Sequence, residues 1–331
     1  MLPRLMTMLL FLGLSTSLSN SVRAQSFTPQ EITALKNILR CVSYVGVDSD
    51  GHPAIVVGSG GAGRDAGCNV RIVNSTGQTN TANGRGNLHL GYSTNLWGFP
   101  RTGSHNLVSG DLNGFTGNAN IVTGSENRAN GYGGGIIGGW NNQSEGPNAV
   151  IVAGDANLIA STAIYGAIVG GTENVARGQA SAVVGGVSNE TSLTGFAAVV
   201  VGGINNLVGA FYAVAMAGEE NSIDWPSNAS AVVGGHSNQT LVSSHATAVG
   251  GTGNGVSGNY ATSVGGDSNS ASGPASTVVG GTNNSATGSS SNVTGGNGNS
   301  ASGTSSTVSG GANRSVSGTN NWRGGGYFQS N

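Results

Sequence analysis

Short apolar runs that end in glycine recur along the chain from about residue 87 onward. Clear examples are Ala182-Val-Val-Gly-Gly186, Ala231-Val-Val-Gly-Gly235 and Thr277-Val-Val-Gly-Gly281. We call the last glycine of each run the marker glycine, and the markers recur at a nearly constant spacing. The markers are Gly110, Gly124, Gly139, Gly154, Gly171, Gly186, Gly203, Gly218, Gly235, Gly251, Gly266, Gly281, Gly296 and Gly311. A unit of this length holds two short strands and two tight turns, and is too short for two helices joined by a turn.

Asparagine lies three residues after the marker glycine in thirteen of the fourteen repeats. The most regular of these asparagines are Asn174, Asn189, Asn206, Asn238, Asn254, Asn269, Asn284 and Asn299. Glycine relieves the steric bar on positive φ, and asparagine tolerates the left-handed region while bonding its own backbone. We therefore expect these asparagines at one corner of every repeat, where stacked side chains can hydrogen-bond along the repeat axis.

The period and the composition of the repeats predict an all-β protein. Residues 87–331 are expected to form a parallel β-solenoid of about 14–15 coils with a 15-residue period. Valine suits the strands. Each coil would hydrogen-bond to the next with a spacing of roughly 4.8 Å between coils, so the rod would be about 65–70 Å long. A thin coil has room inside only for small side chains, which fits an aromatic content of 5%.

Side chains alternate between the two faces of a strand, so the run before each marker separates into inward and outward positions. The positions five, three and one before the marker hold small residues such as Ser181, Val183 and Gly185, which suit a cramped interior. The positions four and two before it then point outward. The column two before the marker reads Val108, Val122, Ile137, Val152, Val169, Val184, Val201, Met216, Val233, Val249, Val264, Val279, Thr294 and Ser309.

Twelve of the fourteen residues in this outward column are apolar. Each would cover roughly 60–120 Å², so the column would expose at least about 700 Å², more than the roughly 300–600 Å² patch of a typical monomer. We expect it to be buried between copies of the chain in a homo-oligomer. We define the valine stripe as Val169, Val184, Val201, Val233, Val249, Val264 and Val279. The alternative is a wider coil in which both valine columns point inward.

The residues before the repeats predict a small N-terminal region. Thr28, Pro29 and Glu31 form a capping box with proline at the first helical position, followed by apolar residues at three- and four-residue steps. This pattern predicts a short amphipathic helix within residues 25–42, beginning near residue 28. The helix would dock on its own chain or on a partner. Residues 43–86 alternate weakly and predict a few short strands, one of them around Ile72 and Val73.

Residues 1–24 have the pattern of a secretory signal peptide. Arg4 is followed by an apolar stretch that is too short to span a bilayer, and Ala24 ends a small-residue cleavage pattern. The alternative is an uncleaved membrane anchor. The pattern predicts export, with no integral membrane segment in the mature chain. Outside the cytoplasm, Cys41 and Cys68 could pair within one chain, pair between chains, or remain free thiols.

Composition and charge exclude several classes of protein. The chain of 331 residues has 60 glycines, only 8% charged residues and a net charge of −2. Collagen would need glycine at every third position, and a nucleic-acid-binding protein would need a basic patch. No zinc or phosphate-loop motif is present, so we expect neither a cofactor nor a metal.

Candidate catalytic chemistry is sparse. The densest acidic cluster, Glu219, Glu220 and Asp224, is expected to be solvated, and His236 and His245 are expected to be surface residues. An enzyme with a β-helical groove would show clustered carboxylates or aromatic residues on one face. We expect no such cluster and therefore no enzymatic activity.

A column of threonines four residues before the marker suggests an alternative function. Thr247, Thr262, Thr277 and Thr307 are expected to point outward, although Asn292 interrupts the column. Regular threonines can order water, as they do in ice-binding solenoids. A flat polar face of this kind serves adhesion or carbohydrate contact equally well.

The phrase Ser-x-Val-x-Gly-Gly-x-x-Asn-x-Ala-x-Gly, seen at 276–288 and in part at 306–318, resembles the head repeats of trimeric autotransporter adhesins. The similarity covers roughly residues 87–326. It implies a left-handed parallel β-roll in which three chains associate side by side. Family members usually carry a coiled-coil stalk and C-terminal membrane strands. We find no heptads or alternating membrane strands here, so we do not expect autotransport or anchoring.

Together these observations predict an exported adhesin-like binding or structural protein, located extracellularly or at the cell surface. The expected partners are other copies of the chain, with a trimer favoured by the resemblance, and a glycan or matrix protein. Nucleic acid is not expected as a partner. The alternative functions are ice binding and a structural element of an extracellular matrix.

Overall fold

The computed structural model describes residues 28–33, 42–45, 54–57, 72–91, 94–325 and 327–329. Contacts divide the chain into one unit of residues 1–71 and a second of residues 72–331. The second unit thus begins within the range 43–86 that the sequence pattern assigns to a separate β region. The expected signal peptide, Cys41 and Cys68 lie outside the described residues, so export and the pairing of the cysteines remain predictions.

The first unit contains a short helix at residues 29–33 and a strand pair. The helix begins with the expected capping box, in which the Glu31 N–H donates to Thr28 Oγ1 (3.2 Å) and the Thr28 N–H donates to Glu31 Oε2 (2.8 Å). Strand β1 (Val42–Val45) pairs antiparallel with β2 (Ala54–Val57). The predicted short helix is therefore confirmed at residues 29–33, whereas Val42, the last residue of the predicted range, belongs to a strand rich in β-formers. Residues 34–41 lie outside the described residues.

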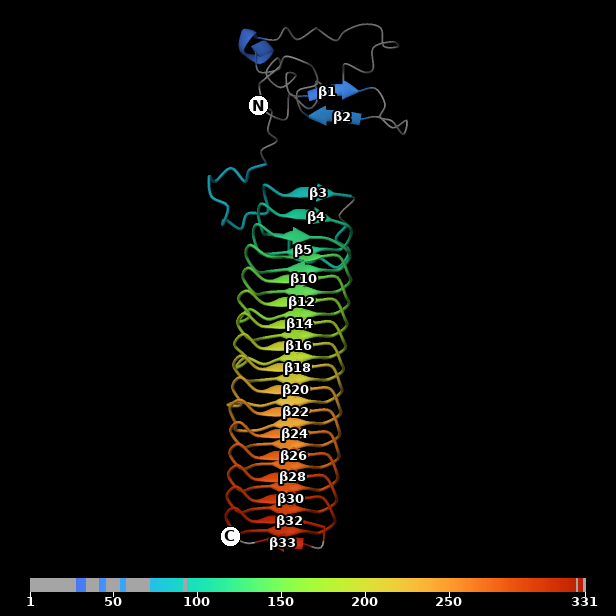
Figure 1. Ribbon diagram of the computed structural model, residues 1–331. Coiled ribbons are helices and arrows are strands. Elements are labelled where there is room, and N and C mark those ends of the chain that lie inside the picture. The colour runs from blue at the N-terminus through green and yellow to red at the C-terminus, as the bar shows by residue number, and fades with distance from the viewer. Residues whose placement is uncertain are drawn as a thin grey trace, which may run out of the picture. The chain divides into compact units, whose positions relative to one another are not determined.

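The second unit is a parallel β-solenoid of about 16 coils (Figure 1). The strands of its first row are β3 (Leu88–Leu90), β4 (Leu107–Ser109), β6 (Ile121–Val122), β8 (Gly135–Ile137), β10 (Val150–Val152), β12 (Ala167–Val169), β14 (Ala182–Val184), β16 (Val199–Val201), β18 (Val214–Met216), β20 (Ala231–Val233), β22 (Thr247–Val249), β24 (Thr262–Val264), β26 (Thr277–Val279), β28 (Asn292–Thr294), β30 (Thr307–Ser309) and β32 (Trp322–Gly324). Each strand pairs in parallel with its counterpart in the next coil. The predicted strand around Ile72 and Val73 is absent at these two residues.

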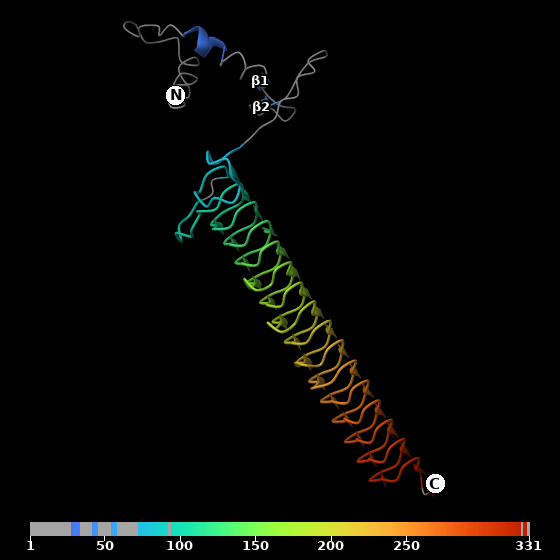
Figure 2. The same cartoon turned by 90° about the vertical axis from the view of Figure 1, so that its left-hand side faces the viewer.

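A second row of two-residue strands lies on another side of each coil, and Figure 2 shows the coils as successive open loops. These strands are β5 (Gly114–Phe115), β7 (Arg128–Ala129), β9 (Gln143–Ser144), β11 (Leu158–Ile159), β13 (Val175–Ala176), β15 (Glu190–Thr191), β17 (Leu207–Val208), β19 (Ser222–Ile223), β21 (Gln239–Thr240), β23 (Gly255–Val256), β25 (Ser270–Ala271), β27 (Ser285–Ala286), β29 (Ser300–Ala301) and β31 (Ser315–Val316). A third row of single-residue parallel bridges runs from Asp111 to Ala312. At the far end, β33 (Tyr327–Gln329) pairs antiparallel with β32.

The apolar columns of the solenoid core consist mainly of Ala, Val and Ile side chains, and one early coil buries Phe115, which is larger than expected for a thin coil. Val183 of the first row is fully buried, whereas its neighbour Val184 is exposed. The alternative of a wider coil with both valine columns inside is therefore wrong. In the second row the inward residue is also buried, and it ranges from Ala176 and Val208 to Ile223 and Phe115. Among the described residues, no helix is long and apolar enough to cross a bilayer.

The first two repeats depart from the predicted alternation. Val108 and Val122 were expected to point outward, but both are fully buried. They are in register with Ile136, which lies three residues before its marker glycine rather than two. In these two repeats the segment between the buried valine and the marker glycine is one residue shorter than in later repeats, so the inward position shifts by one residue relative to the marker.

The expected asparagine ladder is present, and it lies inside the solenoid. The main-chain N–H of Asn206 donates to Asn189 Oδ1 (3.0 Å), and the Asn206 Nδ2 group donates to the same oxygen (3.0 Å) and to the Gly218 carbonyl (3.1 Å). Asn174, Asn189, Asn206, Asn238, Asn254, Asn269, Asn284 and Asn299 are all buried. The left-handed conformation belongs instead to the preceding residue, such as Asn205 with φ 53°. The asparagines thus satisfy buried backbone groups rather than form the bend.

The marker glycines are required where neighbouring coils approach most closely. Gly186 has φ +85°, and a Cβ there would collide with the carbonyl oxygen of Gly203 and the amide nitrogen of Asn189. Gly185, one residue earlier, has φ +69° and its nearest neighbouring atom would be 3.8 Å away. The second glycine of each pair is therefore fixed by packing between coils and not only by its own backbone angles.

Candidate functional site

The valine stripe forms a line of exposed side chains along the first row of strands. Val169, Val184, Val201, Val264 and Val279 are 37–46% exposed, and Val233 and Val249 are half-buried. Strand pairing keeps them in register, since Val184 pairs with Val201. The structure therefore brings the predicted stripe residues together on one outer face. Coverage of this face by another copy of the chain remains a prediction.

A second outward column runs beside the valine stripe and changes character along the rod. In the earlier coils it is apolar and half-buried, at Val150, Ala167, Ala182, Val199, Val214 and Ala231. From β22 onward it becomes polar and contains the predicted threonine column, Thr247, Thr262, Thr277 and Thr307. The apolar face is thus two columns wide in the middle of the rod and one column wide further along.

The second row of strands carries an outer face of hydroxyl groups in the last coils. Its two outward columns are Ser270, Ser285, Ser300 and Ser315, and Ser272, Thr287, Ser302 and Ser317. Each pair flanks a buried residue such as Ala286, which belongs to the core. We call these eight residues the serine face. It did not enter the sequence predictions, although the repeated Ser-Ala-Ser phrase indicates it by its two-residue alternation.

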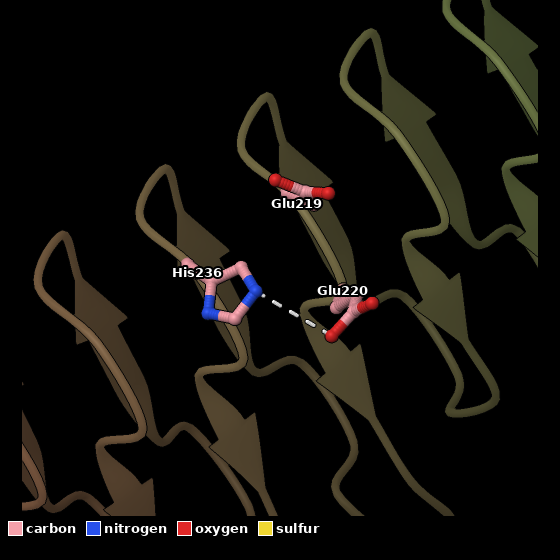
Figure 3. A group of neighbouring side chains, drawn as sticks. All are labelled: Glu219, Glu220 and His236. Carbon is pink, nitrogen blue, oxygen red and sulfur yellow. Dashed lines mark ion pairs between the residues drawn. The ribbon is translucent and has the colours of Figure 1, made fainter.

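Glu219, Glu220 and His236 form a surface group on two successive coils (Figure 3). The His236 Nε2 atom is 3.5 Å from Glu220 Oε2, and one ligand atom of each residue lies within 4.8 Å of the others. All three side chains are exposed, as expected for solvated residues. Asp224 does not join them and instead accepts a hydrogen bond from Gln239 Nε2 (2.7 Å). Exposed carboxylates of this kind are common without an ion, so we assign the group no function.

Exposed aromatic residues gather at the corner between the second and the first row of strands. We define the aromatic ridge as Phe196, Phe211, Tyr212, Trp225, His245 and Tyr260. Ring centroids lie 5.6 Å apart for Phe196 and Tyr212, 4.7 Å apart for Phe211 and Trp225, and 4.8 Å apart for the stacked pair His245 and Tyr260. The expectation that aromatic residues do not cluster on one face is therefore wrong.

The aromatic ridge arises where the repeat departs from its usual length. The repeats that end at Gly203 and Gly235 have 17 residues and the repeat that ends at Gly251 has 16, against 15 in the regular repeats, and the extra residues lie in the loops of this corner. Phe196 and Trp225 occupy two of these enlarged loops. Only Trp225 is shifted out of the common register, because Tyr212, His245 and Tyr260 share one offset from their markers. The column reading missed the ridge because it was limited to the five positions before each marker glycine.

A hydrogen-bonded loop of residues 94–101 lies against the first coils. Arg101 Nε donates to the Asn113 carbonyl (2.8 Å), and Thr94 Oγ1 donates to Asp111. The hydrogen bond from Thr94 lowers the pKa of the Asp111 carboxyl. Burial, and secondarily the charge of Arg101, lowers the pKa of His89. These contacts hold the loop in place and are structural.

Neither a protein-family model nor a curated protein matches the chain. The resemblance to adhesin heads therefore rests on the repeat phrase and on the parallel solenoid of about 16 coils. The repeated solenoid is what the structure shows, and the outer faces described above are the candidate functional surfaces.

Proposed function

We propose that this chain is an exported, adhesin-like binding protein whose rods associate side by side through the valine stripe. The observation that carries the proposal is the line of exposed and half-buried apolar side chains on one face, the valine stripe with Met216 between Val201 and Val233, flanked by a second apolar column in the middle of the rod. Contiguous apolar surface of this kind marks an interaction site in soluble proteins. A line parallel to the rod axis suits a partner of the same length and period, which another copy of the chain provides.

Association of several rods would give the protein its binding strength. The resemblance to adhesin heads favours three chains related by a closed symmetry. Every coil repeats similar outer positions, so weak contacts with a glycan or a matrix protein would be multiplied along each rod and among the rods. This mode of action needs no cofactor and no catalytic group.

Stripe variants of the mature chain, residues 25–331, test this proposal. Val184→Asn combined with Val201→Asn places two asparagines in the valine stripe. Ser285→Asn combined with Ser300→Asn is the control, which places two asparagines on the serine face. Binding to immobilised matrix proteins and to a glycan array is measured together with the solution mass. We expect the stripe variant to lose self-association and with it about 10²–10⁴-fold in apparent affinity, with the control unchanged.

Two results would contradict the proposal. One is a wild-type protein that binds no arrayed glycan or matrix protein; if it still self-associates, the chain is a structural matrix element. The other is a stripe variant that keeps the mass and the affinity of the wild type.

The serine face favours ice binding as a second candidate. Its hydroxyl groups form a flat array with a spacing of roughly 4.8 Å along the rod, set by the pairing of successive coils. Thermal hysteresis of a protein solution is the measurement that decides. An ice-binding chain would show hysteresis that Ser285→Asn combined with Ser300→Asn reduces, and its absence in the wild type would eliminate this candidate.

A further inference from the structure

We propose that the aromatic ridge binds an uncharged polysaccharide that lies along the axis of the rod. The inference rests on the proposed function as a binding protein, and it names a ligand class and a place on the solenoid. It does not depend on the valine stripe, because the ridge belongs to the corner loops and the stripe to the first row of strands.

Backbone hydrogen bonds hold the ridge in register from one coil to the next. The Tyr212 N–H donates to the Phe196 carbonyl (3.0 Å), and the His245 N–H donates to the Asn228 carbonyl (3.0 Å). The Tyr260 N–H donates to the Ser244 carbonyl (2.9 Å). With roughly 4.8 Å between coils, the ridge is about 20 Å long. A linear polymer that lies parallel to the rod would contact one or two aromatic rings in each coil of the ridge.

The fold does not need aromatic rings at these positions. Tyr212 and Tyr260 lie at the tip of the corner loop in the left-handed conformation, with φ 55° and 60°, and they are 64% and 65% exposed. Ala229 and Ser290 fill the same tip in other coils with φ 52° and 55°. Since the tip keeps this conformation with alanine or serine as well, the fold does not require an aromatic residue there, and the exposed ring is available at the surface.

The charge of the corner selects the class of ligand. The loops 193–198, 210–213, 225–230, 242–246 and 258–261 contain no Asp, Glu, Lys or Arg. Asp224, which precedes Trp225, accepts a hydrogen bond from Gln239 Nε2 (2.7 Å) and adds no positive charge. Nucleic acids and anionic membranes need cationic partners, which these loops lack. A sugar ring instead offers an apolar C–H face that packs on an aromatic ring, and hydroxyl groups that require neutral donors and acceptors.

Neutral hydrogen-bonding groups flank the rings in the same loops. The Asn228 Oδ1 atom accepts from the Phe211 N–H (3.2 Å), and the Asn259 Oδ1 atom accepts from the Ser244 N–H (2.8 Å). Each amide oxygen is therefore occupied by the neighbouring coil, and the amide NH₂ groups remain to donate to sugar hydroxyls. Rings with amide donors beside them suit an uncharged glycan better than a purely apolar partner.

The experiment measures binding of four linear neutral oligosaccharides to the mature chain by isothermal titration calorimetry. The probes are cellohexaose, laminarihexaose, mannohexaose and chitohexaose. Trp225→Ala and Tyr212→Ala remove rings of the ridge, and Trp225→Phe keeps one. Trp140→Ala is the matched control, because Trp140 is also 49% exposed but lies in the row of bridges outside the ridge. Circular dichroism checks that all variants fold.

We expect at least one probe to bind the wild type, and each ridge alanine to weaken it about tenfold, or about 1.4 kcal/mol. Trp225→Phe should recover most of the affinity, and Trp140→Ala should stay within about twofold of the wild type. The proposal is overturned if no probe binds at millimolar concentration, or if Trp140→Ala weakens binding as much as Trp225→Ala. A ridge variant with a changed solution mass also overturns it, since the ridge would then be a contact between copies.

The two proposals can fail separately. If the wild type self-associates and binds a matrix protein but binds none of the four oligosaccharides, only the assignment of the ridge as a glycan site is refuted. If a probe binds through the ridge while the wild type is a monomer, the proposed association of rods is refuted and the proposed glycan site stands.

Discussion

Removing one asparagine from the buried ladder should destabilise the solenoid far more than removing its exposed neighbour. Asn206 is buried, and its Oδ1 atom accepts from the main-chain N–H of Asn221 (3.0 Å) and from the Asn221 side chain (3.1 Å). Asn206→Ala takes this acceptor away and leaves the Asn221 N–H without its partner inside the protein. Asn205→Ala is the matched control, because Asn205 is exposed and Ala156 fills the same turn position with φ 54°.

The magnitude follows from the hydrogen bonds that are lost. A buried donor without a partner costs about 1–3 kcal/mol, and each further net hydrogen bond contributes about 1 kcal/mol. The Gly218 carbonyl, which also loses a bond from Asn206 Nδ2, still accepts from the Ile204 N–H (2.9 Å). We therefore expect Asn206→Ala to lower the free energy of unfolding by about 2–4 kcal/mol, and Asn205→Ala by no more than about 0.5 kcal/mol.

Guanidinium unfolding followed by circular dichroism measures the difference, at one fixed protein concentration because self-association would add to the apparent stability. Hydrogen exchange adds a local readout, since the amide of Asn221 should exchange faster in Asn206→Ala than in the control. The reasoning is refuted if the two variants unfold at the same denaturant concentration and the Asn221 amide keeps its protection.

Two further predictions concern the corners and the first coils. Gly186→Ala should lower the free energy of unfolding by about 3–5 kcal/mol, because its Cβ would collide with the next coil. Gly185→Ala should lower it by only about 1–2 kcal/mol, the energy of placing alanine in the left-handed conformation. Equal unfolding midpoints for the two variants would contradict this. The lowered pKa of His89 favours its neutral form in the fold, so its contribution to stability is present above the ordinary histidine pKa and lost as the pH falls through the folded value. An NMR titration should place the His89 midpoint below the ordinary value, and Arg101→Gln should raise it; a midpoint at or above the ordinary value would contradict the structure.

The repeat unit was predictable because its residues recur in register. Glycine at the marker and asparagine three residues later reveal the period, and two-residue alternation correctly places Val183 inside and Val184 outside. The errors occur where the register changes. Val108 and Val122 point inward because the segment between each of them and its marker glycine is one residue shorter, so that counting back from the marker gave the wrong face.

The aromatic ridge was missed because the column reading stopped five residues before each marker glycine, and the ridge lies further back in the corner loops. Tyr212, His245 and Tyr260 share one offset from their marker glycines, and only Trp225, in the longer repeat that ends at Gly235, departs from the common offsets. Only the stacking of coils, through bonds such as that from the Tyr212 N–H to the Phe196 carbonyl, brings the rings to one edge. Similarly, the contact between His236 and Glu220 joins residues of successive coils.

The solution mass of the mature protein tests the account most directly, because the proposed function depends on rods that associate through the valine stripe. Sedimentation equilibrium at micromolar concentration gives that mass independently of shape. We predict a multiple of the protomer mass, three by resemblance to adhesin heads, that falls to one protomer in the variant carrying Val184→Asn and Val201→Asn. A monodisperse wild-type monomer would contradict the account.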